Sequence, residues 1–502
     1  MVDIEVAVVG SGIAALTTSA LIAKEGVEVA LFEQGADAGG YAHGFKRGEY
    51  HFDPAVHVLA DPDLFDGVLT HLGVRDRVKF LDVDRFYRLQ VEDFSIDVPT
   101  GRERYIETLS ERFPHEADGI RSFMELCAKV HVQAHDLPPR IGLDALDDAA
   151  RKYPELFEWR KRTVDQALDQ HLTDPVLRAA ISTTWNYLGV PPSQASFLTF
   201  AQLTCVHLDG VFGFEGGIQV LVDTLVASIE ENGGSVHLKS DVTKILVEDG
   251  RAIGVQLADG TTVRASAVIS GADPFQTFDK LVGEEHLPPA FVRRYRKLRP
   301  SSSAFVLFAA TTCDLTQYDP PNQIFSFSSL DYEDVYRRTS EGFLGTRCIT
   351  PASVLDPTVA PPGEHVVNAN ANAPFSVPEP WGDIKQRCQE ELIDVVDSVL
   401  PGFKDGLTYV ESATPLTMAG YSRNVAGAIH SFEQTPDQVE TKRPPQVTPI
   451  KGLLMSSQWT STGGSALRSF VAGIAAARLV LNEIGSSDGI PDFRSVPNLL
   501  EV

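Results

Sequence analysis

A short glycine-rich turn near the amino terminus has residue types and spacing that suit the binding of a pyrophosphate. It reads GSGIAA over residues 10–15. Gly10 suits a tight turn, Gly12 lets the backbone approach a diphosphate, and the small Ala15 lets a helix pack closely on a sheet. Glu33 follows at the interval where an acidic side chain can bond ribose hydroxyls. The pattern predicts a dinucleotide site; the alternative is a coincidental glycine-rich turn.

The stretches around this turn are the elements that such a site requires. Residues 4–9 are an apolar run rich in β-branched side chains, which predicts a buried parallel strand. A helix is expected to start at residue 13 and to end at Gly26, and residues 27–32 predict a second strand. The amino-terminal dipole of that helix would face the pyrophosphate. Because the strand, turn, helix, strand and acid all occur in order, a dinucleotide site is the favoured interpretation.

A glycine pair, Gly39-Gly40, follows Glu33 after a short interval. With this pair the segment resembles the FAD-binding amine-oxidase superfamily, which includes the phytoene desaturases, carotenoid isomerases and retinol saturases. In that superfamily the pair passes the flavin side of the cofactor and is usually followed by Arg, where this chain has Tyr41. The next segment crosses near the flavin ring in the desaturase group. Phe52-Asp53 match its pattern, whereas residues 54–57 do not.

Later segments extend the resemblance over nearly the whole chain. Residues 213–269 contain a Gly-Gly pair, an expected helix, a second Gly-Gly pair, two expected strands and a β-hairpin with an Asp-Gly turn. In the superfamily the residue matching Val242 holds the adenine through its backbone, and the segment around Gly271 crosses back to the cofactor domain. Residues 413–436 are similar to the isomerase and retinol-saturase branch.

The carboxy-terminal segment is the second informative one. Trp459 and Gly464 lie in a turn after an expected strand at 452–455, and a helix is expected over residues 466–484. The family usually has Gly-Gly-Gly and then Pro, where this chain has Ser465 and Ala466. A helix start beside the flavin would place positive dipole where the reduced ring gains negative charge. The resemblance implies FAD, expected to be bound non-covalently because no Cys or His stands where a covalent link would form.

The expected site residues follow from these segments. Two catalytic candidates are His57, as a proton donor at the flavin face, and Tyr421; each has the alternative of a structural role, and the main chemistry is expected on the flavin. No metal site is expected. The expected cofactor contacts are Gly10, Gly12, Ile13, Ala14, Ala15, Glu33, Gln34, Gly39, Gly40, Tyr41, Val242, Gly271, Trp459, Gly464, Ser465 and Ala466.

Composition limits the class of protein. The 502 residues carry a net charge of −25, which argues against nucleic-acid binding and against docking on an anionic membrane by charge alone. Five scattered cysteines predict reduced core thiols in a cytosolic protein. No signal peptide is expected, since the first strand starts almost at once. A cytoplasmic location follows, with peripheral membrane contact left open.

The predicted fold class is α/β plus α+β. It consists of a Rossmann-type, glutathione-reductase-like FAD-binding domain in discontinuous segments, with an inserted mixed substrate domain. The expected boundaries are 1–75, 211–285 and 446–502 for the cofactor segments, 76–210 for the mainly helical part of the substrate domain, and 286–445 for its sheet-containing part.

A run without Asp, Glu, Lys or Arg covers residues 179–208. Two prolines and many polar residues interrupt it, so it is not a membrane span. Two interpretations stay open: two buried helices joined by a turn, or an apolar wall of a substrate tunnel. Substitutions at the aromatic residues Phe197 and Phe200 would distinguish these two interpretations.

The function expected from the resemblance is an FAD-dependent oxidoreductase that desaturates, saturates or isomerises C–C and C=C bonds of an apolar polyene, carotenoid-like or secondary-metabolite substrate. A flavin amine oxidase is an alternative, in which Trp459 and Tyr421 would form an aromatic cage. A non-catalytic escort protein that binds prenylated partners is another, and it would be colourless. No second dinucleotide unit is found, so the electron acceptor stays open.

Overall fold

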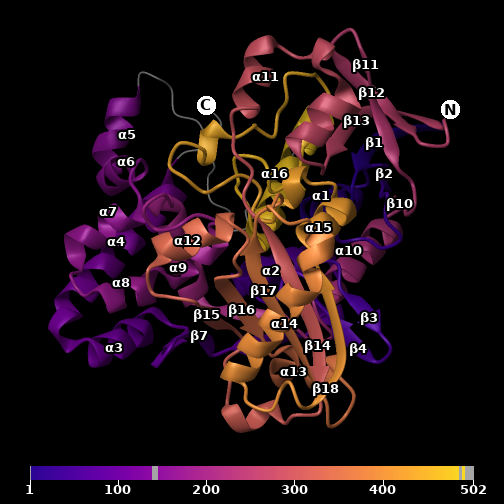
Figure 1. Ribbon diagram of the computed structural model, residues 1–502. Helices are drawn as coiled ribbons and strands as arrows, with labels where there is room; N and C mark the ends of the chain where they lie inside the picture. Colours follow the sequence, from indigo (N-terminus) through magenta and orange to yellow (C-terminus); the bar gives the residue numbers. More distant parts are fainter. Residues whose placement is uncertain (1, 138–144, 485–488, 492–502) are drawn as a thin grey trace.

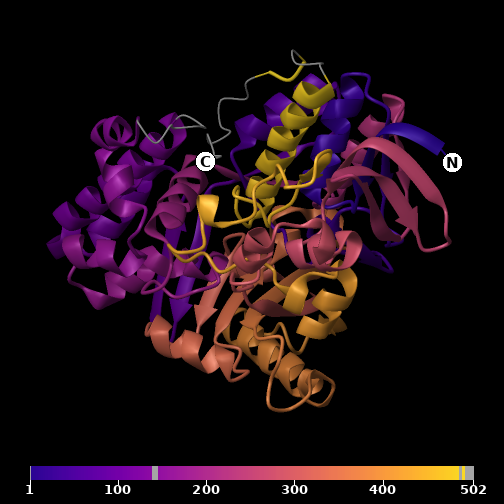
Figure 2. The ribbon, with the colours of Figure 1, turned by 90° about the horizontal axis from the view of Figure 1, so that it is seen from above.

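The computed structural model describes residues 2–137, 145–484 and 489–491. Figure 1 shows a first sheet with helices α1, α10 and α16 at the upper right, a second sheet below it, and a group of helices on the left. The view from above in Figure 2 again places this helical group on the side opposite the first sheet. The three parts meet at the centre of the molecule.

The first sheet collects strands from three separate stretches of the chain. Strand β1 runs parallel to β2 and to β13, with Val8 opposite Leu31 and Ile269. Residues 6–9 of β1 are apolar and buried, as predicted for a buried parallel strand, whereas Asp3 and Glu5 in its first half are exposed. The strand order is β10 (Ser235–His237), β2 (Val29–Phe32), β1 (Val2–Val9), β13 (Thr262–Ser270), β12 (Arg251–Leu257) and β11 (Val242–Glu248), and β19 (Leu453–Met455) pairs with β13.

Helix α1 (Ile13–Lys24) is fixed between this sheet and two other helices, α10 (Gln219–Glu231) and α16 (Ala466–Ile484). A Cβ on Gly473 of α16 would lie 2.6 Å from the carbonyl oxygen of Ala14, so only glycine allows this approach. The Thr18 hydroxyl also donates to the Gly473 carbonyl at 3.0 Å. The amino terminus of α1 is therefore held firmly at the carboxyl end of β1. The predicted hairpin with its Asp-Gly turn is confirmed as β12–β13.

The second sheet contains strands from both expected parts of the substrate domain. Its order is β18 (Leu407–Ala413), β14 (Ser303–Thr311), β17 (His365–Ala373), β16 (Thr346–Thr350), β15 (Ile324–Phe327), β7 (Arg85–Val91) and β8 (Phe94–Pro99). All neighbours are antiparallel except β15 and β7. One face is apolar and packs against α14 (Trp381–Val399).

The helical group packs around one apolar core. That core also contains Phe325 and Phe327 of β15, so the helices and the edge of the second sheet form one packed unit. Two short helices follow one another here, because Pro154 starts a separate helix after α5. The helices are α3 (Arg102–Arg112), α4 (Ala117–Asp136), α5 (Leu146–Lys152), α6 (Pro154–Trp159), α7 (Val164–His171), α8 (Pro175–Ser182) and α9 (Phe197–Asp209).

Short elements join these parts. Residues 40–42 form a 3₁₀ turn, and strand β3 begins at Phe45. All five cysteines are free, and four of them are buried. The remaining elements are β3 (Phe45–Arg47), β4 (Tyr50–Phe52), β5 (Leu59–Ala60), β6 (Phe80–Val83), β9 (Val211–Phe214), α2 (Pro62–Leu72), α11 (Pro289–Tyr295), α12 (Tyr332–Ser340), α13 (Ala352–Leu355) and α15 (Pro415–Ser422).

Within the described residues, no helix has both the length and the apolar character needed to cross a bilayer. The same residues hold no cluster of His, Cys, Asp and Glu that could bind a metal ion.

Candidate functional site

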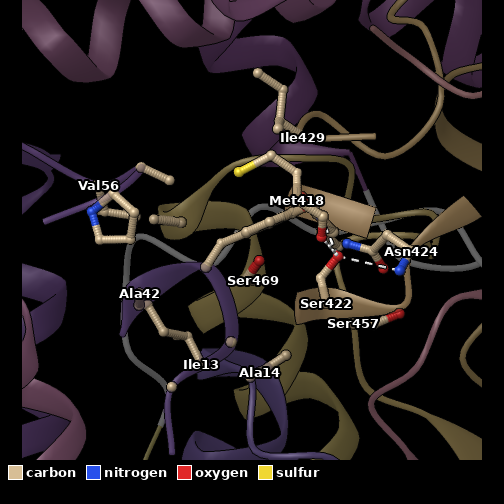
Figure 3. A pocket seen from close by; sticks show the side chains of 18 of the residues that line it. Ile13, Ala14, Ala42, Val56, Met418, Ser422, Asn424, Ile429, Ser457 and Ser469 are labelled. Atoms are coloured by element: carbon tan, nitrogen blue, oxygen red, sulfur yellow. Dashed lines mark hydrogen bonds between the residues drawn. The ribbon is translucent and has the colours of Figure 1, made fainter. Parts of the chain in front are cut away.

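One cavity of about 360 Å³ lies where the three parts of the molecule meet. Figure 3 shows Ile13 and Ala14 on one side of it, with Met418 and Ile429 across from them. Fourteen of the sixteen expected cofactor residues line it: Gly10, Gly12, Ile13, Ala14, Glu33, Gln34, Gly39, Gly40, Tyr41, Val242, Gly271, Trp459, Ser465 and Ala466.

Ala15 and Gly464 are not among the lining residues of the cavity. Ala15 is fully buried, and its Cβ would lie 3.1 Å from a Cβ built on Gly271. Its small side chain therefore makes room for the crossing at Gly271. A Cβ on Gly464 would lie 2.2 Å from the His430 carbonyl oxygen, so this glycine is required by the packing of the 430–431 segment.

The glycines of the first turn face open space. Gly10 has φ +85°, and a Cβ built on Gly10 or on Gly12 would meet no protein atom within 4 Å. Gly12 caps α1 at φ −63°, a conformation that any residue adopts, and no side chain caps the helix amino terminus. The protein itself therefore does not require glycine at position 12. Space and unfilled N–H groups at a helix start are what an anionic ligand needs.

Gly39 and Gly40 serve a different purpose. Their φ angles are +122° and +59°, a region that favours glycine, and Gly39 N–H donates to the Ser11 carbonyl at 3.0 Å. A Cβ on Gly40 would lie 3.3 Å from the Cα of Gly12. This pair therefore braces the back of the first turn and keeps it in shape.

Glu33 stands at the end of β2 with both carboxylate oxygens fixed. One oxygen accepts the Ser11 N–H at 2.9 Å and the Ser11 hydroxyl at 2.7 Å, and the other accepts the Gly35 N–H at 2.7 Å. These bonds orient an acceptor toward the cavity with little remaining freedom. A carboxylate oxygen has further lone pairs, so this arrangement suits a ligand with hydroxyl donors.

Two expected cofactor residues, Tyr41 and Trp459, are connected through Ser422 and Asn424, two residues that the sequence did not single out. The Tyr41 hydroxyl lies 3.0 Å from the Ser422 hydroxyl, and the Trp459 indole N–H donates to Asn424 Oδ1 at 3.3 Å. Asn424 N–H donates to the Ser422 hydroxyl at 3.1 Å, as drawn in Figure 3. Burial raises the pKa of Tyr41. The 421–424 segment therefore covers the cavity from the substrate side.

Tyr421, a catalytic candidate, lies at the Glu33 end of the cavity. Its ring stacks on His43 at 5.2 Å, and its carbonyl accepts from Gln34 Nε2 at 3.2 Å. Burial and the nearby Glu33 and Asp37 raise its pKa far above the ordinary value. Beside it Arg423 pairs with Asp241 through bonds of 2.7 and 3.0 Å, next to Val242.

His57, the other catalytic candidate, borders two cavities. It lines the main one, and also a smaller one of about 40 Å³ together with Asn322 and Thr350. Its Nε2 is buried and has no hydrogen-bond partner among the described residues, and the same holds for Asn322 Nδ2 and Thr350 Oγ1. Burial lowers the pKa of His57, while Asp53 opposes this shift. A space of this size has room for a water molecule, which would satisfy these three groups.

The far end of the cavity belongs to the substrate part, and the sequence reasoning missed it. Polar residues from six elements or loops line it: Asn186, Tyr187, His207, Gln323, Cys348, Asn370, Asn372 and His430. A signal was present, because residues 368–373 alternate Asn and Ala along a strand. This alternation places three asparagines on one face of β17.

The uncharged run is two buried helices joined by a turn, as one interpretation predicted. Phe197 and Phe200 as tunnel residues are wrong: both are fully buried and pack against Phe123, with ring centroids 6.0 and 6.2 Å apart. Further along the same helix α9, Leu203 and His207 line the cavity. The run therefore packs in the core at the start of α9 and forms cavity wall towards its end.

Comparison with known proteins decides the family. A family model described as "Flavin containing amine oxidoreductase" matches residues 13–481. The chain belongs to this family. It is thus a flavin-dependent oxidoreductase, with the predicted fold class: a Rossmann-type cofactor domain and an inserted mixed domain.

Three similar proteins illustrate the range of this family. All-trans-retinol 13,14-reductase from Danio rerio is 25% identical over 91% of this chain and 82% of its own length. Phytoene desaturase (lycopene-forming) from Pseudescherichia vulneris is 26% identical over 81% of this chain and 85% of its own length. A structure of putrescine oxidase has a TM-score of 0.66 at 14% identity and covers 96% of this chain and 99% of its own; it shows the fold alone.

Proposed function

We propose that the chain binds FAD non-covalently and transfers hydrogen at C–C or C=C bonds of an apolar polyene, by desaturation, saturation or double-bond isomerisation. The observation that carries the proposal is the single cavity that joins the glycine turn and Glu33 to residues of the substrate part. Two relatives are named for a reductase of retinol and a desaturase of phytoene, both polyenes.

The residues present fit the cofactor. The open space at Gly10 and Gly12 and the uncapped start of α1 suit the pyrophosphate, and the fixed Glu33 suits a ribose. The pair Asp241–Arg423 and Tyr421 lie at that same end, which favours a role for Tyr421 in cofactor binding over one at the reacting atoms. Burial raises the pKa of the cavity thiol Cys348 to about 12, so it stays protonated and unreactive, in line with non-covalent binding.

The chain's own residues orient the substrate and handle protons. Bound flavin supplies two-electron hydride chemistry when present. Met418, Ile429, Val56 and Leu203 supply apolar wall for a hydrocarbon chain. Hydride transfer at one carbon requires a proton to leave or reach its neighbour. Neutral His57 has a free Nε2 between the main cavity and the small polar one, so it can exchange that proton with water there.

Oxidation of an amine is the second candidate, because the family name and putrescine oxidase point to it. An aromatic cage of Trp459 and Tyr421 is not supported by their contacts. Trp459 packs edge-on against Phe432 at 4.8 Å, whereas Tyr421 stacks on His43. Among the described residues that line the cavity, the acids are Glu33, Asp37 and Asp241, all on loops of the cofactor part. An ammonium substrate would find no carboxylate at the far end.

The first test is to purify the protein, release its flavin with acid and identify the released compound. In the second, phytoene, lycopene or putrescine is added without oxygen, in the presence of an artificial electron acceptor or donor, and the absorbance of the flavin is followed. The proposal expects free FAD and a response to a polyene. A colourless protein, a flavin that stays attached, or a response to putrescine alone would overturn it.

The role of His57 is tested separately with His57→Gln. We expect normal flavin content and substrate binding, with turnover lowered about 10²-fold or more and a changed pH profile. His115→Gln, at an exposed histidine of the helical group, is the matched control. Unchanged turnover in His57→Gln would assign this residue to packing.

A further inference from the structure

The second sheet presents polar side chains to the cavity, although apolar side chains would suit the proposed polyene substrate. Strand β17 places Asn370 and Asn372 on the cavity side. Ala369 and Ala371 on the other face are fully buried in the apolar core under α14. An amide buried without a hydrogen bond costs free energy, so the partners of these amides are informative.

Four amide side chains, here called the amide wall, line this end of the cavity: Asn186, Gln323, Asn370 and Asn372. Asn372 Nδ2 donates to Asn186 Oδ1 at 2.8 Å, which leaves Asn372 Oδ1 without a donor among the described residues. The Tyr187 hydroxyl donates to Gln323 Oε1, which leaves Gln323 Nε2 without an acceptor in the same part of the chain. Asn370 makes no side-chain hydrogen bond to any described residue. Both donors and acceptors therefore remain for a molecule in the cavity.

The groups around the amide wall carry no charge at neutral pH. Burial lowers the pKa of His207 and of His430 to about 4, so both rings are neutral. His207 Nδ1 bonds the Leu203 carbonyl at 2.7 Å, which leaves its Nε2 as an acceptor. Burial keeps the Cys348 thiol protonated. Arg423, the lining cation, is paired with Asp241 at the Glu33 end.

We propose that the amide wall binds an uncharged polar group, such as a hydroxyl, carbonyl or carboxamide, at one end of an otherwise apolar substrate. The inference rests on the proposed function and names the substrate class more closely. An ionised head group would lose its hydration here without gaining a counter-ion. A pure hydrocarbon would leave buried amides unpaired, and sites built to bond a polar group reject analogues that lack it.

A head-group series on one polyene chain tests this. Retinol, retinal, retinoic acid, retinylamine and the parent hydrocarbon are titrated at pH 8 without oxygen into the flavin-loaded protein, and binding is followed by quenching of tryptophan fluorescence. We expect the affinity for retinol and retinal to be at least about ten-fold higher than the affinity for the parent hydrocarbon and for retinoic acid. Equal affinities across the series, or the hydrocarbon binding best, would overturn the proposal.

Substitutions in the amide wall test whether it causes the preference for a polar head group. Asn370→Leu should remove most of the preference for retinol over the hydrocarbon, while Asn370→Asp should shift preference toward retinylamine by about ten-fold. Asn368→Leu, the same substitution on the same face of β17 but not among the residues that line the cavity, is the matched control and should keep the preference. Flavin content and melting temperature are recorded for each protein. If Asn370→Leu changes flavin affinity and leaves the head-group preference intact, the wall contacts the cofactor and the proposal is wrong. Absence of flavin in the wild type would instead refute the proposed function.

Discussion

Replacing Gly12 by alanine separates the needs of the fold from the needs of the ligand. At φ −63° alanine is unstrained, and its Cβ would meet no protein atom within 4 Å. The lower entropy of the unfolded chain favours alanine by about 0.4–1 kcal/mol, and its poorer fit at a helix N-cap offsets this gain, so the stability of the flavin-free protein should change by no more than about 1 kcal/mol. In the flavin-loaded protein the same methyl group would occupy space next to a bound pyrophosphate.

The expected loss of FAD affinity follows from overpacking. An extra methyl in a filled site costs about 1–3 kcal/mol, which corresponds to a roughly 5- to 150-fold weaker affinity, and Gly12→Val should abolish binding. The assay is titration of apoprotein with FAD by fluorescence, together with urea unfolding of the apoprotein.

Gly382→Ala is the matched control for this experiment. Gly382 also has no atom near its Cβ position, but it lies exposed on α14 and away from the cavity. It should keep both its FAD affinity and its stability, the latter to within about 1 kcal/mol. Full FAD affinity in Gly12→Ala would refute the assignment of the first turn, and an apoprotein destabilised by more than about 2 kcal/mol would refute the argument from open space.

Three further results are expected. Glu33→Ala should weaken FAD about ten-fold or more in the same titration, since a charge-assisted bond is worth about 1.5–3 kcal/mol; unchanged affinity would move the ribose elsewhere. Phe197→Asp should unfold the helical group, whereas Leu203→Asp should stay folded and yellow but lose turnover of a polyene. Melting temperature and activity are measured for both variants, and the reverse pattern would contradict the assignment of Phe197 to the core and Leu203 to the cavity wall. Burial lowers the pKa of His207 and of His430 to about 4, so the unfolded chain binds protons before the folded protein does as the pH falls below about 6.5. The free energy of unfolding, measured with urea, should therefore be about 2 kcal/mol lower per histidine at pH 5 than at pH 8. This loss of stability should be smaller when both histidines are replaced by glutamine.

Local sequence determined the cofactor part of the site. The turn at Gly10 and Gly12, the helix that follows it and Glu33 are close in sequence, and each obeys a rule that acts over a few residues. Steric freedom at glycine, the N–H groups at a helix start and the periodicity of apolar side chains can all be derived without knowing the rest of the fold. For the same reason the hairpin β12–β13 and the helices α1 and α16 were predicted correctly.

The tertiary structure alone decided the substrate side. Asn186, Gln323 and Asn370 are far apart in sequence and come together only because β15, β16 and β17 pair in one sheet beside the 183–187 turn. The strand alternation showed that β17 has a polar face, but not what that face meets. Helix α9 is apolar nearly all round, so its pattern could not separate Phe197, in the core, from Leu203, in the cavity wall. Which face of such an element is packed and which lines a cavity depends on the neighbours it meets, and those are fixed by long-range contacts.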